Sequence, residues 1–174
     1  GIYFSMPDFL NTAHTINSAD DAEALLSRLE QMGQALDYNT QEQAELGKCG
    51  VVAPDFCLGL TIEQMAKLRA PAAADNTIAR SLVQRTGAKG IAGDWGARAA
   101  KIIDASVYPA LDRQIALIKQ QRAKARTSAG VWDVPQGDGI YAAALAQATT
   151  TNFSPDEVHK IGLEEVAEIS AELD

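Results

Sequence analysis

Apolar residues recur at three- and four-residue spacing along most of the chain, and this spacing predicts helices from one end to the other. The first clear stripe consists of Leu25, Leu29, Met32 and Leu36. Ser18 precedes it, and Asp21 follows three residues later at the position that completes a capping box. We therefore expect a helix from Ser18 to about Leu46. No run of alternating apolar and polar residues predicts a sheet.

Two shorter helices are predicted next. Thr61 and Gln64 repeat the capping-box spacing, and Pro71 is expected to end the helix that they start. A further apolar stripe begins near Ile78 and closes at Gly87.

The longest helix is predicted from a cap at Asp94 to about Arg126. Pro109 lies inside its apolar pattern. Because proline lacks an amide donor and its ring clashes with the preceding turn, we expect a kink or a short break near Tyr108.

The last two helices are expected to start at Asp138 and at Ser154, where Glu157 completes another capping box. The final stripe consists of Val158, Ile161, Gly162, Val166, Ile169 and Leu173. Because no glycine or basic last turn follows it, we expect this helix to continue in a longer natural chain. The pattern predicts an all-α fold, with residues 1–174 forming a single domain of about five or six helices, one of them long and kinked.

Composition and charge narrow the classes of function. Hydrophobic residues make up 47% of the chain and charged residues 22%, values typical of folded globular proteins. The net charge of −8 repels a phosphate backbone, so nucleic acid is not an expected partner. No apolar run approaches the roughly 20 residues that cross a bilayer. The aromatic residues Tyr108, Trp132 and Tyr141 are expected in the core.

Candidate chemistry within the chain is sparse. The two histidines, His14 and His159, are far apart in sequence, and no cysteine pair has two-residue spacing, so no metal ligands and no catalytic residues are assigned. Cys49 and Cys57 flank a short turn-rich stretch, where unpaired thiols are favoured over a disulfide. His14 stands among small polar residues in "LNTAHTINS", where it either faces a cleft or ties the opening segment to the next helix.

Three stretches carry a resemblance to a known family: "MPDFLNTAHTINSADDAEALLSRLEQMGQALDYNT", "KGIAGDWGARAAKIIDASVYPALDRQIALI" and "GVWDVPQGDGIYAAALAQATTTNFSPDEVHKIGLEEVAEISAEL". Together they resemble the N-terminal half of the uncharacterised bacterial family catalogued as domain of unknown function 885. The resemblance implies a fragment of a larger helical, zincin-like fold, in a protein that is exported to the periplasm or lipid-anchored as a lipoprotein.

The family's zinc motif, His-Glu-x-x-Pro-Gly-His-His, lies downstream of the matched region and has no counterpart here. The resemblance thus implies zinc in the full-length protein and no cofactor in this segment. The leading hypothesis is the N-terminal region of a zinc-dependent metallopeptidase or related hydrolase, not catalytic alone. Its expected partners are the rest of its own chain and a peptide substrate, with His14 and then Tyr141 as the candidate substrate-binding residues.

The competing hypothesis is a non-catalytic helical module that binds a ligand or another protein. A natural chain end close to residue 174 would favour it. Self-association of the segment through apolar surface is compatible with either hypothesis.

Overall fold

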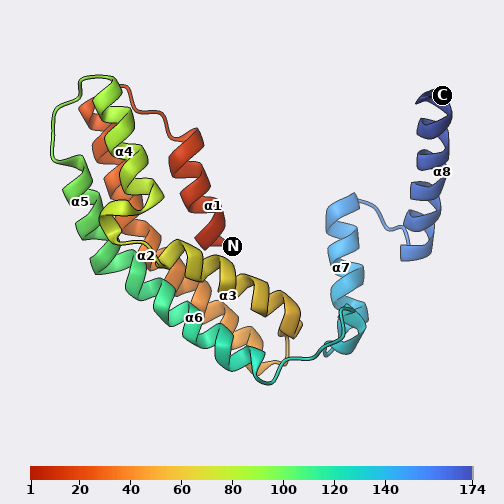
Figure 1. Ribbon diagram of the computed structural model, residues 1–174. Helices are drawn as coiled ribbons and strands as arrows, with labels where there is room; N and C mark the ends of the chain where they lie inside the picture. Colours follow the sequence, from red (N-terminus) through yellow and green to blue (C-terminus); the bar gives the residue numbers. More distant parts are fainter. Residues whose placement is uncertain (174) are drawn as a thin grey trace. The chain divides into compact units, whose positions relative to one another are not determined.

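The computed structural model describes residues 1–173, and every regular element in this range is helical (Figure 1). The longer helices are α1 (Ile2–Asp8), α2 (Ala19–Lys48), α3 (Asp55–Arg69), α4 (Thr77–Ala88), α5 (Trp95–Ile102), α6 (Tyr108–Arg122), α7 (Gly137–Thr149) and α8 (Pro155–Leu173). Short turns of other helical types are η1 (Phe9–Ala13), η2 (Ala73–Asp75), η3 (Ile103–Val107) and η4 (Val131–Asp133). The prediction of an all-α fold is confirmed.

The chain groups into two compact units, Gly1–Thr127 and Ser128–Asp174. Each unit is described by itself below. That residues 1–174 form a single domain stays a prediction.

Two predicted helix starts are confirmed. At the start of α2 the Ser18 hydroxyl accepts a hydrogen bond from the amide of Asp21 at 3.2 Å, and the Asp21 carboxylate accepts one from the amide of Ser18 at 2.9 Å. Hydrogen bonds from the Asn17 amide and from Ser18 lower the pKa of Asp21. Ser154 and Glu157 form the same box at the start of α8, where the amide of Ser154 lowers the pKa of Glu157.

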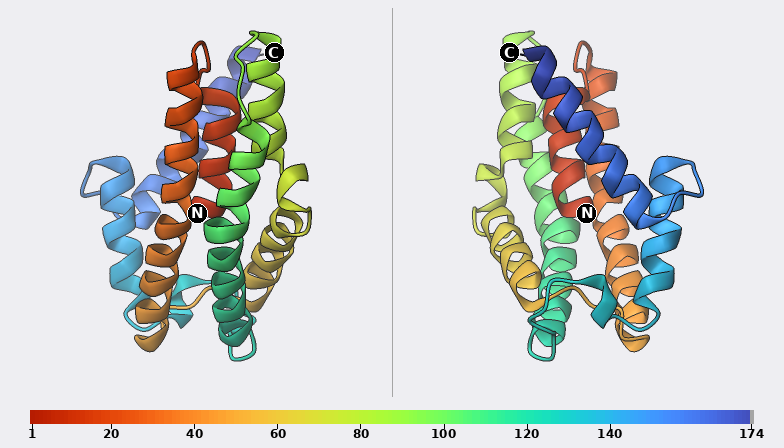
Figure 2. Two further views of the ribbon diagram at one scale, coloured as in Figure 1. Left: turned by 90° about the vertical axis from the view of Figure 1, so that its left-hand side faces the viewer. Right: turned by 90° about the vertical axis from the view of Figure 1, so that its right-hand side faces the viewer.

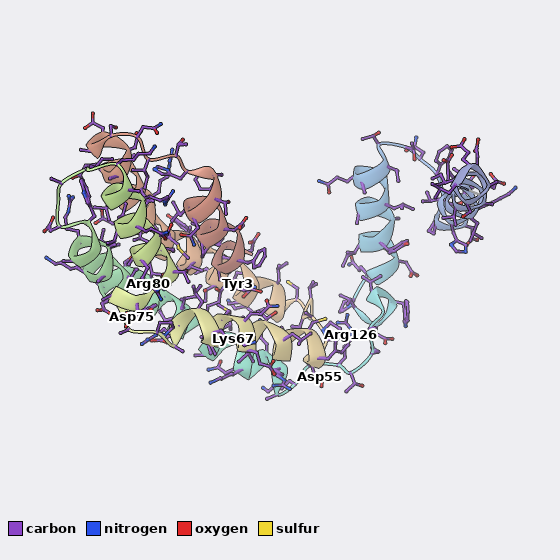
Figure 3. All side chains as sticks on the ribbon, turned by 45° about the horizontal axis from the view of Figure 1, so that its top comes forward. Tyr3, Asp55, Lys67, Asp75, Arg80 and Arg126 are labelled. Atoms are coloured by element: carbon purple, nitrogen blue, oxygen red, sulfur yellow. The ribbon has the colours of Figure 1, made fainter. Side chains whose placement is uncertain are left out.

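The predicted start at Thr61 is wrong, because α3 begins six residues earlier at Asp55. Its first amide, that of Asp55, donates to the carbonyl of Arg126 at 2.9 Å, a residue far away in sequence (Figure 3). The Thr61 hydroxyl lies inside the helix and donates to the carbonyl of Cys57. Cys57 therefore lies in a helix rather than in a turn, and both it and Cys49 are free thiols.

The predicted break near Tyr108 is confirmed. Between α5 and α6 the chain forms one π-helical turn, η3, in which the amide of Tyr108 donates to the carbonyl of Ile103 five residues back. Pro109 follows in the first turn of α6, where its missing amide costs least. The helix ends at Arg122, short of the predicted Arg126.

The core of the first unit lies between α2, α4 and the stretch from α5 to α6. Its fully buried side chains include Leu25, Leu29, Met32, Leu36, Ile78, Leu82, Ile103, Leu111 and Ile118. Figure 2 shows α2 beside the stretch from α5 to α6. Ion pairs join α2 to this stretch, as in Glu23 with Arg98 and Asp37 with Arg113. The separation in sequence is nearly the same in both pairs, so α2 and this stretch run in the same direction.

Gly33 sets the closest approach in this packing. A Cβ atom at Gly33 would lie 2.0 Å from the hydroxyl oxygen of Ser106 in η3. Only a residue without a side chain lets α2 approach the π-helical turn this closely.

The second unit is built from η4, α7 and α8. Trp132 is 73% exposed and Tyr141 is 47% exposed, so the prediction that they lie in the core is wrong. Tyr108, in the first unit, is 3% exposed and confirms its part of that prediction. The difference comes from tertiary packing: the first unit surrounds Tyr108 with several helices, whereas α7 and α8 contain few buried positions.

Candidate functional site

His14 is buried, with 6% of its surface exposed, at the end of the opening segment. Its Nε2 atom lies 2.9 Å from the carbonyl oxygen of Asp21, and its Nδ1 atom contacts a guanidinium nitrogen of Arg28. A carbonyl only accepts and a guanidinium only donates. Both ring nitrogens therefore have partners inside the molecule.

Arg85 of α4 holds the same segment from the other side. Its guanidinium donates to the carbonyl of His14 at 2.6 Å and to the carbonyl of Leu10 at 2.8 Å. Burial lowers the pKa of Arg85. The segment before α2 is thus tied to α2 through His14 and to α4 through Arg85. This geometry agrees with the tying role that the sequence left open for His14, and a role in substrate binding stays a prediction.

Tyr141, the second candidate, lies on α7 in the other unit. His159 is exposed on α8. Among residues 1–173, no three His, Cys, Asp or Glu side chains come together in a way that could hold a metal ion.

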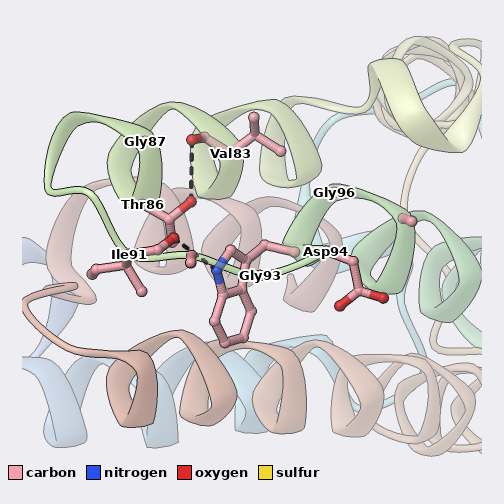
Figure 4. A pocket seen from close by; sticks show the side chains of 10 residues that line it. Val83, Thr86, Gly87, Ile91, Gly93, Asp94 and Gly96 are labelled. Atoms are coloured by element: carbon pink, nitrogen blue, oxygen red, sulfur yellow. Dashed lines mark hydrogen bonds between the residues drawn. The ribbon is translucent and has the colours of Figure 1, made fainter.

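One hollow of about 350 Å³ lies between the end of α4 and the start of α5 (Figure 4). Val83, Thr86 and Gly87 line it from α4, and residues 91–97 line it from the following loop and α5. Most of the polar groups that line this hollow form hydrogen bonds with neighbouring groups of the same unit. The Thr86 hydroxyl donates to carbonyls of its own helix, and the Trp95 indole donates to the carbonyl of Ile91 at 3.2 Å.

Gly93 shapes this hollow. Its φ angle of +155° is one that side chains rarely permit, and a Cβ there would lie 2.6 Å from the indole of Trp95. The glycine-rich stretch before α5 therefore lets the chain close over the indole, which is buried. The hollow is mostly apolar, and its volume is at the lower end of the range for ligand sites, so it can hold a small apolar group. Its lining residues do not include a nucleophile next to a general base.

A second hollow of about 350 Å³ lies at the π-helical turn, lined by Glu30, Arg98, Lys101, Ile102, Ala105 and Ser106. Turns of this type are frequent at functional sites. Here, however, Arg98 is occupied by a two-pronged ion pair with Glu23, at 2.5 and 2.6 Å. Hydrogen bonding to Arg98 lowers the pKa of Glu23, and the reverse contact raises that of Arg98.

The whole chain, residues 1–174, matches the family described as "Bacterial protein of unknown function (DUF885)". The chain belongs to this family.

A solved structure shares the fold of this DUF885 chain. It is described as "the putative lipoprotein from Colwellia psychrerythraea", and it superposes with a TM-score of 0.85 at 20% sequence identity. The match covers 98% of this chain and 30% of the solved one, so the DUF885 chain spans about 30% of the length of that protein. No curated protein matches the sequence.

No helix within residues 1–173 is both long enough and apolar enough to cross a membrane. In addition, α8 has no buried residue, although its sequence carries the apolar stripe described above. The stripe was visible in the sequence, but its exposure was not, because burial depends on what packs against a helix.

Proposed function

We propose that this chain is the helical N-terminal region of a zinc-dependent hydrolase that cleaves peptide or related amide bonds, and that it is not catalytic alone. One observation carries the proposal: the chain has the fold of a solved protein but covers only 30% of that protein's length. The resemblance to a zincin-like family supplies the reaction class. In this proposal the zinc ligands lie in the remaining part.

The structure supports a scaffolding role for the first unit. Its buried and half-buried polar groups mostly bind other groups of the same unit, as in the contacts of Arg85 with Leu10 and His14. Buried polar networks of this kind hold one arrangement of helices rigidly. In our proposal this unit forms a rigid wall beside the substrate, and the chemistry is supplied elsewhere.

We further propose that the protein acts in the periplasm or attached to a membrane by a lipid. The solved protein of the same fold is described as a lipoprotein. The absence of a membrane-crossing helix from residues 1–173 is compatible with that location.

The decisive experiment is to measure the intact mass and bound zinc of the protein purified from the cells that make it, captured with an antibody against residues 1–127. We expect a mass several times the 18.5 kDa of this chain, with about one zinc per chain. A mass near 18.5 kDa without zinc contradicts the proposal and leaves the non-catalytic helical module as the function.

Tyr141 offers a test of substrate contact that does not disturb folding. The ring is half exposed, so Tyr141→Phe should leave stability unchanged. The substitution is made in the protein in the form that its cells produce. If the Tyr141 hydroxyl contacts substrate, KM for peptide hydrolysis should rise roughly 3- to 10-fold, which corresponds to the loss of about one hydrogen bond. Tyr38→Phe, which alters another exposed tyrosine on α2, is the matched control. Equal kinetics for both variants would remove Tyr141 from the site.

A further inference from the structure

Helix α8 leaves a continuous apolar stripe uncovered. It runs over 19 residues from Pro155 to Leu173 and contains no buried residue. Ile169 is 53% exposed and Val166 is 63% exposed. Most of the stability of a helix in a protein comes from packing of its apolar face rather than from helix propensity. A partner surface that covers the stripe would therefore stabilise α8.

The stripe has a notch at its centre. With about 100° between successive residues, five of its six members, Val158, Gly162, Val166, Ile169 and Leu173, fall within an arc of about 80°, and the sixth, Ile161, lies about 60° beyond this arc. A Cβ added at Gly162 would meet nothing within 4 Å. Glycine inside a helix costs about 1 kcal/mol relative to alanine. On the apolar face it lets the backbone of a partner helix approach closely.

Charge marks one edge of the stripe. Glu165, Glu168 and Glu172 lie along the same edge, whereas the opposite edge carries His159 and Ser170. A second copy packed antiparallel would bring the two glutamate edges together, and their like charges would repel. The net charge of −8 on each chain adds to this repulsion. An apolar groove with Lys or Arg along one rim would complement both the stripe and its glutamate edge.

We infer that α8 docks in such a groove, formed by the part of the same polypeptide that corresponds to the unmatched length of the solved relative. The inference rests on the proposed function, since it requires a longer protein. Beyond the proposed function, the inference names α8 as the helix that joins this chain to the rest of the polypeptide. It also states the chemistry of the groove in which α8 would dock.

The test is cysteine labelling of two positions on α8. In a background with Cys49→Ser and Cys57→Ser, Ile169→Cys places a thiol on the stripe, and Ala167→Cys places a control thiol on the opposite, exposed face. Each variant is made in the 174-residue chain and in the protein as its cells make it, and the rate of reaction with a maleimide is measured.

We expect both thiols of the 174-residue chain to react at similar rates. In the longer protein the thiol at position 169 should react at least about tenfold more slowly than the thiol at 167, the factor that corresponds to 1.4 kcal/mol of protection. Equally fast reaction at both positions in the longer protein overturns the docking. So does protection at position 169 in the 174-residue chain, which points to a second copy if it grows with concentration and to the first unit if it does not.

The result also separates this inference from the proposed function. A long, zinc-containing protein with a freely reacting thiol at position 169 keeps the proposed function and refutes the docking of α8. A native protein of 18.5 kDa refutes both.

Discussion

The substitution Gly33→Ala tests how closely α2 packs against the π-helical turn. Two effects oppose each other at this site. Alanine is favoured over glycine inside a helix by about 1 kcal/mol. Against this, the new Cβ would lie 2.0 Å from the hydroxyl oxygen of Ser106 and 3.0 Å from two of its backbone atoms.

The steric effect should win. The hydroxyl of Ser106 can rotate away, but the backbone atoms belong to the π-helical turn between α5 and α6 and cannot move without shifting both helices. Overpacking of this kind typically costs about 1–3 kcal/mol. After the gain in helix propensity, we expect Gly33→Ala to lower the free energy of unfolding by up to about 2 kcal/mol.

Gly87→Ala is the matched control in the same unit. A Cβ there would meet nothing within 4 Å, and the residue lies in the last turn of α4 with an ordinary backbone conformation. We expect this variant to be more stable than the parent by about 0.4–1 kcal/mol. The same chemical change should therefore have opposite signs at the two sites.

The assay is urea unfolding followed by far-ultraviolet circular dichroism. With a slope of about 2 kcal/mol per molar urea, Gly33→Ala should lower the midpoint by up to about 1 M. A midpoint at or above that of the parent would refute the reasoning. A double-mutant cycle with Ser106→Ala then separates the clash with the hydroxyl from the clash with the backbone. We expect Ser106→Ala to restore part of the stability that Gly33→Ala loses, because it removes the hydroxyl and leaves the backbone atoms in place.

Three further predictions concern polar groups of the first unit. Asn76→Ala should lower the free energy of unfolding by about 2 kcal/mol in urea, because the buried side chain caps α4 at the amide of Ile78 and donates to the hydroxyl of Tyr108. Arg85→Gln should make the chain before α2 more susceptible to limited proteolysis, since the guanidinium holds two of its carbonyls; an unchanged cleavage rate would contradict this. The pKa of Asp21 is lowered in the folded state, so its contribution to stability is present above the ordinary value of 3.8 and is lost as pH falls through the lower folded value. Asp21→Asn should therefore weaken the loss of stability in acid, as measured by urea unfolding across that range.

Several features of the fold followed from the sequence because their causes are local. The caps at Ser18 and Ser154 depend on hydrogen bonds among residues within one turn, so the spacing of a few side chains determines them. The break before Pro109 is equally local, since a missing amide affects only the neighbouring turn. The apolar stripes of α2 and α8 were likewise readable from spacing alone.

Tertiary structure decided the rest, because the partners lie tens of residues away. Helix α3 begins at Asp55, whose amide donates a hydrogen bond to the carbonyl of Arg126. The capping-box residue Thr61 lies inside this helix and does not start it. His14 received partners from α2 and α4 that no local pattern indicated. The apolar stripes of α2 and α8 are equally clear in the sequence, but the stripe of α2 is buried by the helices packed around it and the stripe of α8 is exposed. The reason is that periodicity specifies which face of a helix is apolar but not what covers that face.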